Sequence, residues 1–145
     1  MSFEEVRIVV PCEPVAKGRA RAVSSNGSVV MYTPSKTKNF ESVVGFFSLQ
    51  AMRGKEPIAG PVGLEFEFCM PIPKSWSKQK QDDAESGLIL PANKPDLSNL
   101  IKSAEDGMNG IVYIDDGQIT KLSALKKYSK NVYIGIRVNK ILNNC

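Results

Sequence analysis

Acidic, amide and basic side chains share the polar side of one short segment, KPDLSNLIK. Asp96, Asn99 and Lys102 lie there, and Asp115 and Asp116 follow after an apolar stretch. Carboxylates that meet in a fold can hold a hard divalent cation, and magnesium commonly takes one or two of them plus waters. Such a metal activates water and stabilises a leaving oxygen. These residue types are therefore compatible with metal-dependent hydrolysis of a phosphodiester.

Each of these acids also has an ordinary structural interpretation. Asp96 is well placed to cap the N-terminus of a helix, and the sequence Asp115-Asp116-Gly117 matches a common turn. Taken one at a time, the structural interpretation is favoured. Their order along one chain, with Lys102 between them, is what supports a site.

Composition excludes several kinds of chemistry. The chain has no histidine, which rules out Ser-His and Cys-His nucleophile pairs, histidine-bound zinc and imidazole bases. Cys12, Cys69 and Cys145 are odd in number and widely spaced, as expected of reduced thiols. The length fits a single domain over residues 1–145. The first residues suggest neither a signal peptide nor a membrane span, so we expect a cytoplasmic protein without a membrane role.

Positive charge is uneven along the chain, whose formal net charge is +4. In the segment KGRAR the cations alternate, so an extended backbone places them on one face. A solvated edge strand and a ribbon that follows phosphates both explain this pattern. A second basic run surrounds Trp76, which either stacks on an exposed base or packs on its own domain. The candidates for contacting nucleic-acid phosphates are Lys17, Arg19, Arg21, Lys74, Lys78 and Lys80.

The periodicity of apolar residues predicts an α+β fold, with a mixed, largely antiparallel sheet and two main helices. The helices are expected from Thr33 to Gly54 and from Asp96 to Asn109. Between them, the polar segment 74–96 is expected to be a long functional loop. The expected strands are residues 6–10, 64–70 and 111–114, a hairpin around Asn26-Gly27, and two strands joined near residues 129–131.

The run KPDLSNLIKSAEDGMNGIVYIDDGQI resembles the signature of the RusA family of Holliday junction resolvases, approximately PDxDNLxK followed by DDxQ[VI]. The segments PVAKGRARA, YTPSKTKNFE and LSALKKY are similar to the phage branch of that family. The resemblance implies an α+β endodeoxyribonuclease that depends on magnesium, with manganese as a substitute, and that uses no small-molecule cofactor. It also implies a homodimer that resolves four-way junction DNA by paired symmetric nicks.

Carried over residue by residue, the resemblance makes Asp96 and Asp116 metal ligands and Lys102 a catalytic lysine. Asn99, Asp106, Asp115 and Gln118 also match motif positions. The resemblance makes Asn99, Asp106 and Gln118 supporting residues. It makes Asp115 a further candidate metal ligand.

One position departs from the pattern, because Ser98 stands where the family has a second aspartate. A hydroxyl is neutral and a weak metal ligand. Asp115 or a water can compensate, or the protein binds junctions without cutting them. A general nucleic-acid-binding module without junction preference is a third interpretation, which the ordered motifs disfavour.

Two symmetric nicks are most simply made by two identical sites related by a two-fold axis. One chain carries one candidate acid cluster, so we expect a C₂ homodimer. The apolar residues considered for its surface are Ile111, Val112, Ile114 and Ile141.

Overall fold

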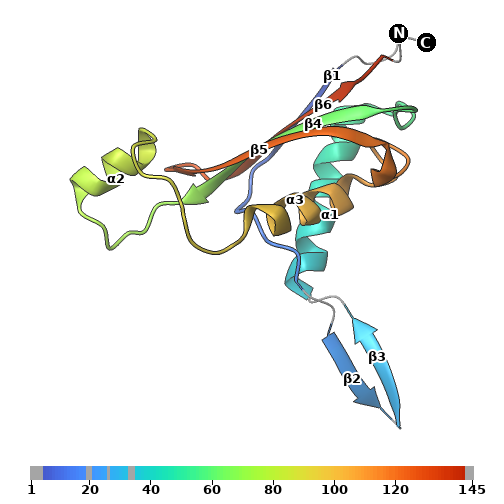
Figure 1. The fold of residues 1–145 in the computed structure, drawn as a ribbon, viewed down its shortest axis with the longest axis horizontal. Coiled ribbons are helices and arrows are strands. Elements are labelled where there is room, and N and C mark those ends of the chain that lie inside the picture. Colours follow the sequence, from blue (N-terminus) through green and yellow to red (C-terminus); the bar gives the residue numbers. More distant parts are fainter. Residues whose placement is uncertain (1–4, 19–20, 26, 33–34, 143–145) are drawn as a thin grey trace.

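A four-stranded sheet with helices on one face forms the centre of the computed structural model (Figure 1). The structure describes residues 5–18, 21–25, 27–32 and 35–142, with the backbone alone for residues 21–25 and 28–32. The strands are β1 (Glu5–Val10), β2 (Arg21–Ser25), β3 (Ser28–Tyr32), β4 (Val62–Pro71), β5 (Ile119–Ser129) and β6 (Tyr133–Lys140). The helices are α1 (Ser35–Met52), α2 (Lys78–Glu85), α3 (Leu97–Met108) and the short 3₁₀ helix η1 (Asp116–Gln118).

The sheet has the strand order β1-β6-β4-β5. Strand β6 runs antiparallel to both β1 and β4, whereas β4 and β5 are parallel. A parallel pair needs a long crossover connection, and α2 and α3 lie in the one between β4 and β5. The prediction of a mixed, largely antiparallel sheet in an α+β fold is thus confirmed.

Buried and exposed residues alternate along the strands, so one face of the sheet packs against the helices. In β1, Val6, Ile8 and Val10 are buried while the residues between them are exposed. They join side chains of β4, β6, α1 and α3 in one hydrophobic cluster. The opposite face of the sheet carries charged side chains, with Arg137 bonded to Glu5 and Glu65. Because one face of the sheet is apolar and the other is charged, α1 and α3 both pack on the apolar face.

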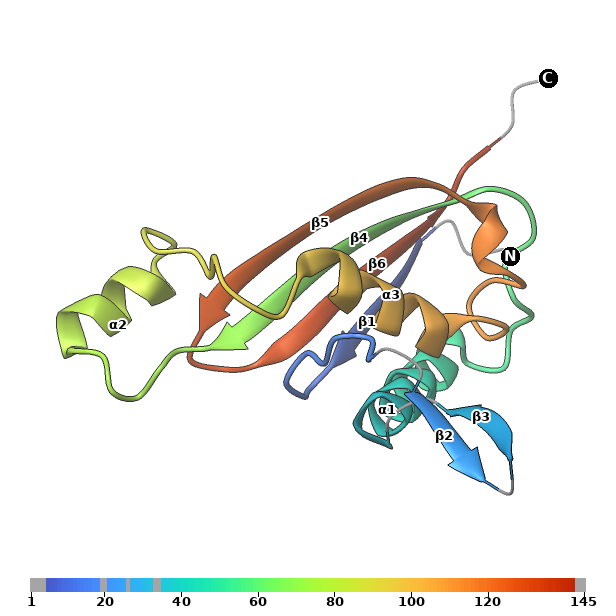
Figure 2. The ribbon, with the colours of Figure 1, turned by 60° about the horizontal axis from the view of Figure 1, so that its bottom comes forward.

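Two parts of the chain differ from the sequence-based expectation. The segment expected to be a loop contains α2, which makes a third α-helix and stands at the end of the sheet away from η1 (Figures 1 and 2). Ser77 caps it by accepting a hydrogen bond from the Lys80 amide. Residues 111–114 form a turn with single β-bridges instead of a strand, because Val112 and Tyr113 are buried beneath the end of α3.

The predicted hairpin around residue 26 is confirmed as the β2–β3 pair, in which Ser25 is opposite Ser28. It projects away from the sheet beyond the start of α1 (Figures 1 and 2). Asn26 itself and the expected helix start at Thr33 lie outside the described residues. None of the helices within the described residues has the length and apolar character that a membrane span requires.

Helices α1 and α3 pack closely against each other at Gly107. A Cβ atom there would lie 2.7 Å from Val44 Cβ and 3.0 Å from the Glu41 carbonyl oxygen. Real side chains do not tolerate such distances, so only glycine permits this contact. On α1, Gly45 lies against the Gly107 carbonyl, where a Cβ would be 3.3 Å from that oxygen.

We expect Gly107→Ala to lower the free energy of unfolding by roughly 1–3 kcal/mol, the usual cost of overpacking. This loss should occur although alanine favours helix formation by about 1 kcal/mol over glycine. Gly45→Ala is the matched control, since its added methyl group has more room, and it should cost less. Urea unfolding of both variants measures the difference, and a more stable Gly107→Ala protein would contradict the packing described.

Candidate active site

Helix α3 carries most of the candidate residues on its solvent side. Its apolar face is buried through Leu100, Ala104 and Met108. Asp96 occupies the predicted N-cap position, but its side chain makes no capping hydrogen bond. Both Asp96 and Ser98 are exposed at this end of the helix. The Asp96 carboxylate is therefore available for chemistry rather than committed to the helix end.

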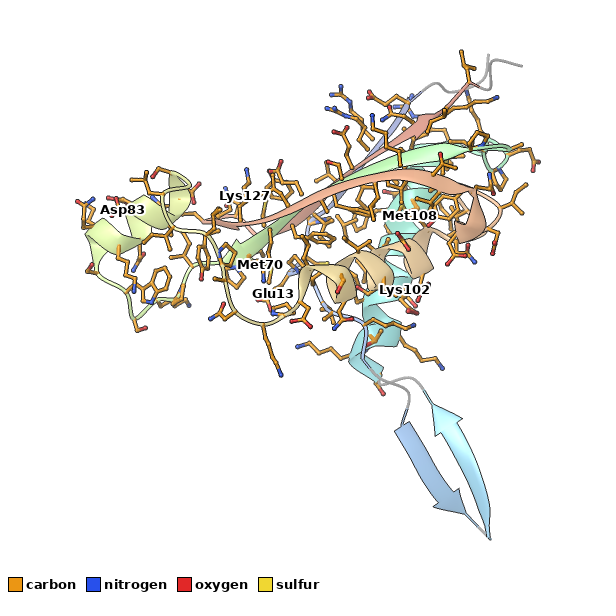
Figure 3. All side chains as sticks on the ribbon, viewed as in Figure 1. Glu13, Met70, Asp83, Lys102, Met108 and Lys127 are labelled. Atoms are coloured by element: carbon orange, nitrogen blue, oxygen red, sulfur yellow. The ribbon has the colours of Figure 1, made fainter. Side chains whose placement is uncertain are left out.

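An alternating series of acids and lysines, which we term the ion chain, links four segments of the protein. Lys17 Nζ lies 2.7 Å from Glu41 Oε1 on α1 and 3.0 Å from Asp106 Oδ2 on α3. Lys102 Nζ lies 3.3 Å from Asp106 Oδ1 and 3.2 Å from Asp116 Oδ2 on η1. Figure 3 shows Lys102 on the outer side of α3, extending away from the sheet. The ion chain thus unites four predicted residues, Lys17, Lys102, Asp106 and Asp116.

The neighbouring carboxylates change the acid–base behaviour of both lysines. The hydrogen bond to Asp116 raises the pKa of Lys102, and the hydrogen bond to Glu41 raises that of Lys17. Both ammonium groups are therefore charged at neutral pH. Beside them, burial raises the pKa of Glu105, so this carboxyl group gains a proton more readily than a solvated glutamate. Lys102 is accordingly a fixed cation rather than a general base.

Gln118 holds the turn that carries Asp116 against the start of β4. Its Nε2 donates to the carbonyl oxygens of Ile58 and Gly60, at 2.7 and 2.8 Å. Its Oε1 accepts from the amides of Ile114 and Asp115. The Asp115 side chain in turn accepts from the Gly117 amide. Asp115 and Gln118 therefore form a capping box that fixes η1 and, with it, Asp116.

Asp96 lies in a separate open cleft of about 760 Å³ at the start of α3. Asn99, Lys36 and Lys94 also line it, together with Gly18 at the base of the β2–β3 hairpin. The Asn99 carbonyl accepts a hydrogen bond from the Lys17 amide, which joins this cleft to the ion chain. The cleft combines two exposed carboxylates, those of Asp96 and Glu13, with two lysines, a combination suited to a phosphate and a cation.

The structure does not bring all the predicted metal ligands together. None of the hydrogen bonds or ion pairs among the described residues joins Asp96 to Asp116, and no described group of three or more acids or cysteines is placed to hold a metal ion. Asp96 and Lys102 are six residues apart, about 9 Å along a helix axis. The oxygen donors fit magnesium by chemistry, since this ion is often bound through one or two carboxylates with waters completing its shell.

The basic candidates fall into different surroundings. Lys17 is part of the ion chain, Arg19 lies outside the described residues, and Arg21 is on β2, where only the backbone is described. Lys74 and Lys78 are exposed near the start of α2.

The remaining candidate, Lys80, places its Nζ 4.1 Å from the centre of the Trp76 ring. That indole packs edge-on against Tyr128. The structure therefore favours packing of Trp76 on its own domain over an unoccupied stacking surface.

Two residues that support the site escaped sequence reasoning. Glu41 anchors the far end of the ion chain, and its only sequence signal is its position as the last charge before an uncharged stretch of α1. Lys126 donates to the carbonyl oxygens of Asn93 and Pro95, at 2.7 and 2.8 Å, and so fixes the segment just before Asp96. No periodic pattern indicates a lysine bound to backbone carbonyls of a distant loop.

Comparison with known proteins agrees with the motif order. Residues 11–139 match the family described as endodeoxyribonuclease RusA. The chain is also similar to the Bacillus subtilis (strain 168) protein named uncharacterized protein YqaN, with 36% identity over 138 residues, covering 94% of this chain and 96% of the relative. The chain belongs to the RusA family. Membership implies a Holliday junction endonuclease that acts on DNA.

We expect Gln118→Leu to destabilise the protein by roughly 1–3 kcal/mol, because it leaves backbone donors and acceptors without partners. The amides of Ile114 and Asp115 should then exchange their hydrogens faster. Gln79→Leu on α2 is the matched control, since among the described residues its side chain makes one hydrogen bond, a solvent-exposed one to the side chain of Asp83. Urea unfolding and amide exchange test both variants, and unchanged exchange at Asp115 would remove Gln118 from its positioning role.

Proposed function

We propose that this protein is a magnesium-dependent endodeoxyribonuclease that resolves four-way DNA junctions by paired, symmetric nicks during recombination and repair. The single observation that carries the proposal is the Asp116 carboxylate, held 3.2 Å from the Lys102 ammonium on the solvent side of α3. Family membership supports it independently. We place this activity in the cytoplasm of a bacterial or phage-infected cell.

Asp96 and Asp116 would hold magnesium or manganese, with Asp115 and Ser98 as further ligands. When bound, the metal would supply an activated water and stabilise the departing oxygen of the phosphodiester. Asp115 accepts a hydrogen bond from the Gly117 amide, and a carboxylate has further lone pairs with which it could bind a cation. The exposed hydroxyl of Ser98 contributes no charge, which leaves the aspartates as the negative ligands.

Lys102 would stabilise the charge that develops on the phosphate. Its ammonium is shared between Asp106 and Asp116 and its side chain is 49% exposed, so a phosphate oxygen can approach it from solvent. Asp106 then keeps the ammonium on this face of α3 when Asp116 binds a cation. Lys17 compensates the charge of Asp106 from the other side. The supporting residues Asn99 and Gln118 fix the two ends of this arrangement.

The DNA backbone would contact the basic residues around α2 and in the segment that leads to the β2–β3 hairpin. Helix α2 and the β2–β3 hairpin project from the body of the protein, and the start of α3 lies between them in Figure 1. Lys74 and Lys78 are exposed on the first of these, and Arg19 and Arg21 belong to the second. Phosphate contacts carry no sequence information, which suits recognition of junction shape.

The alternative function is a junction-binding protein that does not cut, and Ser98 is the observation that favours it. The family's second aspartate is absent at this position, so a negative charge is missing near Asp96. Incubation with a four-way junction and a matched duplex, with and without magnesium, separates the two functions. Paired nicks in the junction alone support resolution, and magnesium-independent binding without nicks supports the alternative.

We expect Asp96→Asn and Asp116→Asn each to abolish junction cleavage while junction affinity stays equal or rises, because each removes a metal ligand's charge and none of the phosphate contacts. Asp96→Asn should also leave stability unchanged, since the Asp96 side chain makes no capping hydrogen bond that the change could remove. Glu56→Gln, an exposed acid remote from α3 in sequence, is the charge-matched control. Nicking assays and gel-shift titrations measure the two properties, and cleavage at the parent rate by either variant would exclude that aspartate as a ligand.

We expect Ser98→Asp to lower the magnesium concentration that gives half-maximal nicking, because it restores the family's second carboxylate. The fold should persist, since a negative charge in the first turn of a helix is favourable by roughly 0.3–1 kcal/mol. Ser98→Asn provides the uncharged control of similar size. An unchanged magnesium response in Ser98→Asp would mean that the existing carboxylates suffice.

A further inference from the structure

A pocket of about 290 Å³ opens where helix α2 and the segments on either side of it meet the end of β5. Trp76 and Tyr128 supply its aromatic side chains. Ile89 and Leu90 supply aliphatic ones, and Lys80 supplies a positive charge. None of these side chains takes part in the cleavage chemistry proposed above. The pocket therefore needs a separate explanation.

The Trp76 indole is a fixed wall of this pocket. Tyr128 is buried and packs edge-on against the indole, with the ring centres 5.3 Å apart. Lys80 Nζ lies 4.1 Å from the centre of the Trp76 ring, and Gln81 Nε2 donates to the Trp76 carbonyl oxygen at 2.8 Å. Backbone and ring are thus both held. A pocket with walls held in this way is already formed before a ligand arrives, as ligand sites usually are.

A second hollow, of about 280 Å³, joins this pocket to the cleft that contains Asp96. Its lining residues overlap with those of both neighbours: Asn93 and Tyr128 also line the pocket, and Glu13, Met70, Lys94 and Pro95 also line the cleft. In Figure 3, Glu13 and Met70 lie between α2 and the start of α3. Pocket, hollow and cleft therefore form one continuous depression, which we term the α2–α3 groove.

The segment from Ala92 to Asp96 runs along the whole groove, because Ala92 lines the pocket and Asp96 lines the cleft. Lys126 fixes this segment through hydrogen bonds to the Asn93 and Pro95 carbonyl oxygens. Asn93 and Asp96 are three residues apart, a span of at most about 11 Å. One strand of DNA advances about 3.4 Å per nucleotide. The pocket thus begins within about three nucleotides of the Asp96 carboxylate.

The α2–α3 groove has the chemistry of a site for single-stranded nucleic acid. Aromatic side chains suit a nucleobase, and lysines along the same groove suit its phosphates. Three lysines and two acids line the hollow and the cleft, and Lys94 among them is exposed. An apolar peptide would fill the pocket but would not use these positive charges. A base within a duplex is stacked and paired and does not reach such a pocket.

We propose that the α2–α3 groove binds an unpaired nucleotide of the DNA substrate, with the base in the pocket beside Trp76 and the phosphates along Lys94 toward the Asp96 cleft. The inference rests on the proposed function for the identity of the substrate. It adds that the protein holds an unpaired base within about three nucleotides of the cut. Extrusion of a base costs least where its pairing is already weakened, so the branch point of a junction is the expected source.

Trp76 is the only tryptophan of the chain, so its fluorescence reports on this pocket alone. Titration with an oligothymidylate of about six nucleotides, without metal so that no cleavage occurs, should quench Trp76 fluorescence to saturation. A blunt duplex long enough to stay paired offers no unpaired base within its length and should quench far less at the same nucleotide concentration. Fluorescence that does not respond to the oligothymidylate, or that responds equally to the duplex, would overturn the proposal.

Leu90→Glu should weaken oligothymidylate binding by roughly fivefold or more, because it places a negative charge at the pocket. Leu88→Glu is the matched control, since it adds the same charge two residues away at a side chain that does not line the pocket. Leu88 and Leu90 are 78% and 59% exposed, so both variants should fold. The fluorescence titration measures both. Equal affinities of the two variants would exclude the pocket as the binding site.

Substitution of the indole tests whether the aromatic wall itself binds the base. Trp76→Leu should weaken binding of a dye-labelled oligothymidylate by at least about fivefold, the usual loss when one stacking ring is removed. Trp76→Phe keeps an aromatic ring and should retain most of the affinity. Fluorescence anisotropy of the dye measures both variants. Native affinity in Trp76→Leu would overturn the assignment of the base to this pocket.

Failure of this inference is distinguishable from failure of the proposed function. Saturable quenching of Trp76 in a protein that does not nick junctions would support the groove and count against cleavage. Magnesium-dependent nicking of junctions by a protein whose Trp76 fluorescence ignores unpaired nucleotides would support cleavage and exclude the groove.

Discussion

The close approach of α1 and α3 at Gly107 sets the geometry on which the site depends. Because Gly107 contributes no side chain there, Glu41 on α1 and Asp106 on α3 lie near enough for the single ammonium of Lys17 to contact both. Asp106 then shares Lys102 with Asp116. The close packing of Gly107 against α1 thus determines where a lysine and an aspartate meet at the surface, at the far end of the ion chain.

Electrostatic balance within the ion chain separates two roles that carboxylates perform in this protein. Asp106 is 24% exposed in its side chain and contacts two lysines, so it orders its neighbours. Asp116 is more exposed and contacts one. Asp96 forms no capping bond at all. Asp96 and Asp116, the acids proposed to bind the cation, have fewer ion pairs with the protein than Asp106 does. This is consistent with a site that gives up stability for reactivity.

Sequence reasoning predicted the elements whose burial is periodic and missed those that depend on distant contacts. Alternation in β1 and β4 and the apolar side of α3 are local patterns, and they were confirmed. Helix α2 was missed because only Ala84 of its residues is buried, and its stability comes from the Ser77 cap and local side-chain bonds. Among the site residues, Asp96 and Lys102 follow from motif spacing. The links through Glu41 and Lys126 could not be predicted, because the local sequence around each residue does not show which distant residues tertiary packing brings next to it.

The position of β6 in the sheet has a consequence for how the chain folds during synthesis. Strand β6 is the last strand in the sequence, yet it lies between β1 and β4 and is the only described strand that pairs with β1 in the sheet. A ribosome-bound chain that has exposed only its first hundred residues can therefore form α1 but cannot assemble this sheet. Folding must wait for nearly complete translation, and pairings of such long sequence separation form slowly. Apolar faces of β1 and β4 stay uncovered in that interval, when the emerging chain is most exposed to aggregation and proteolysis.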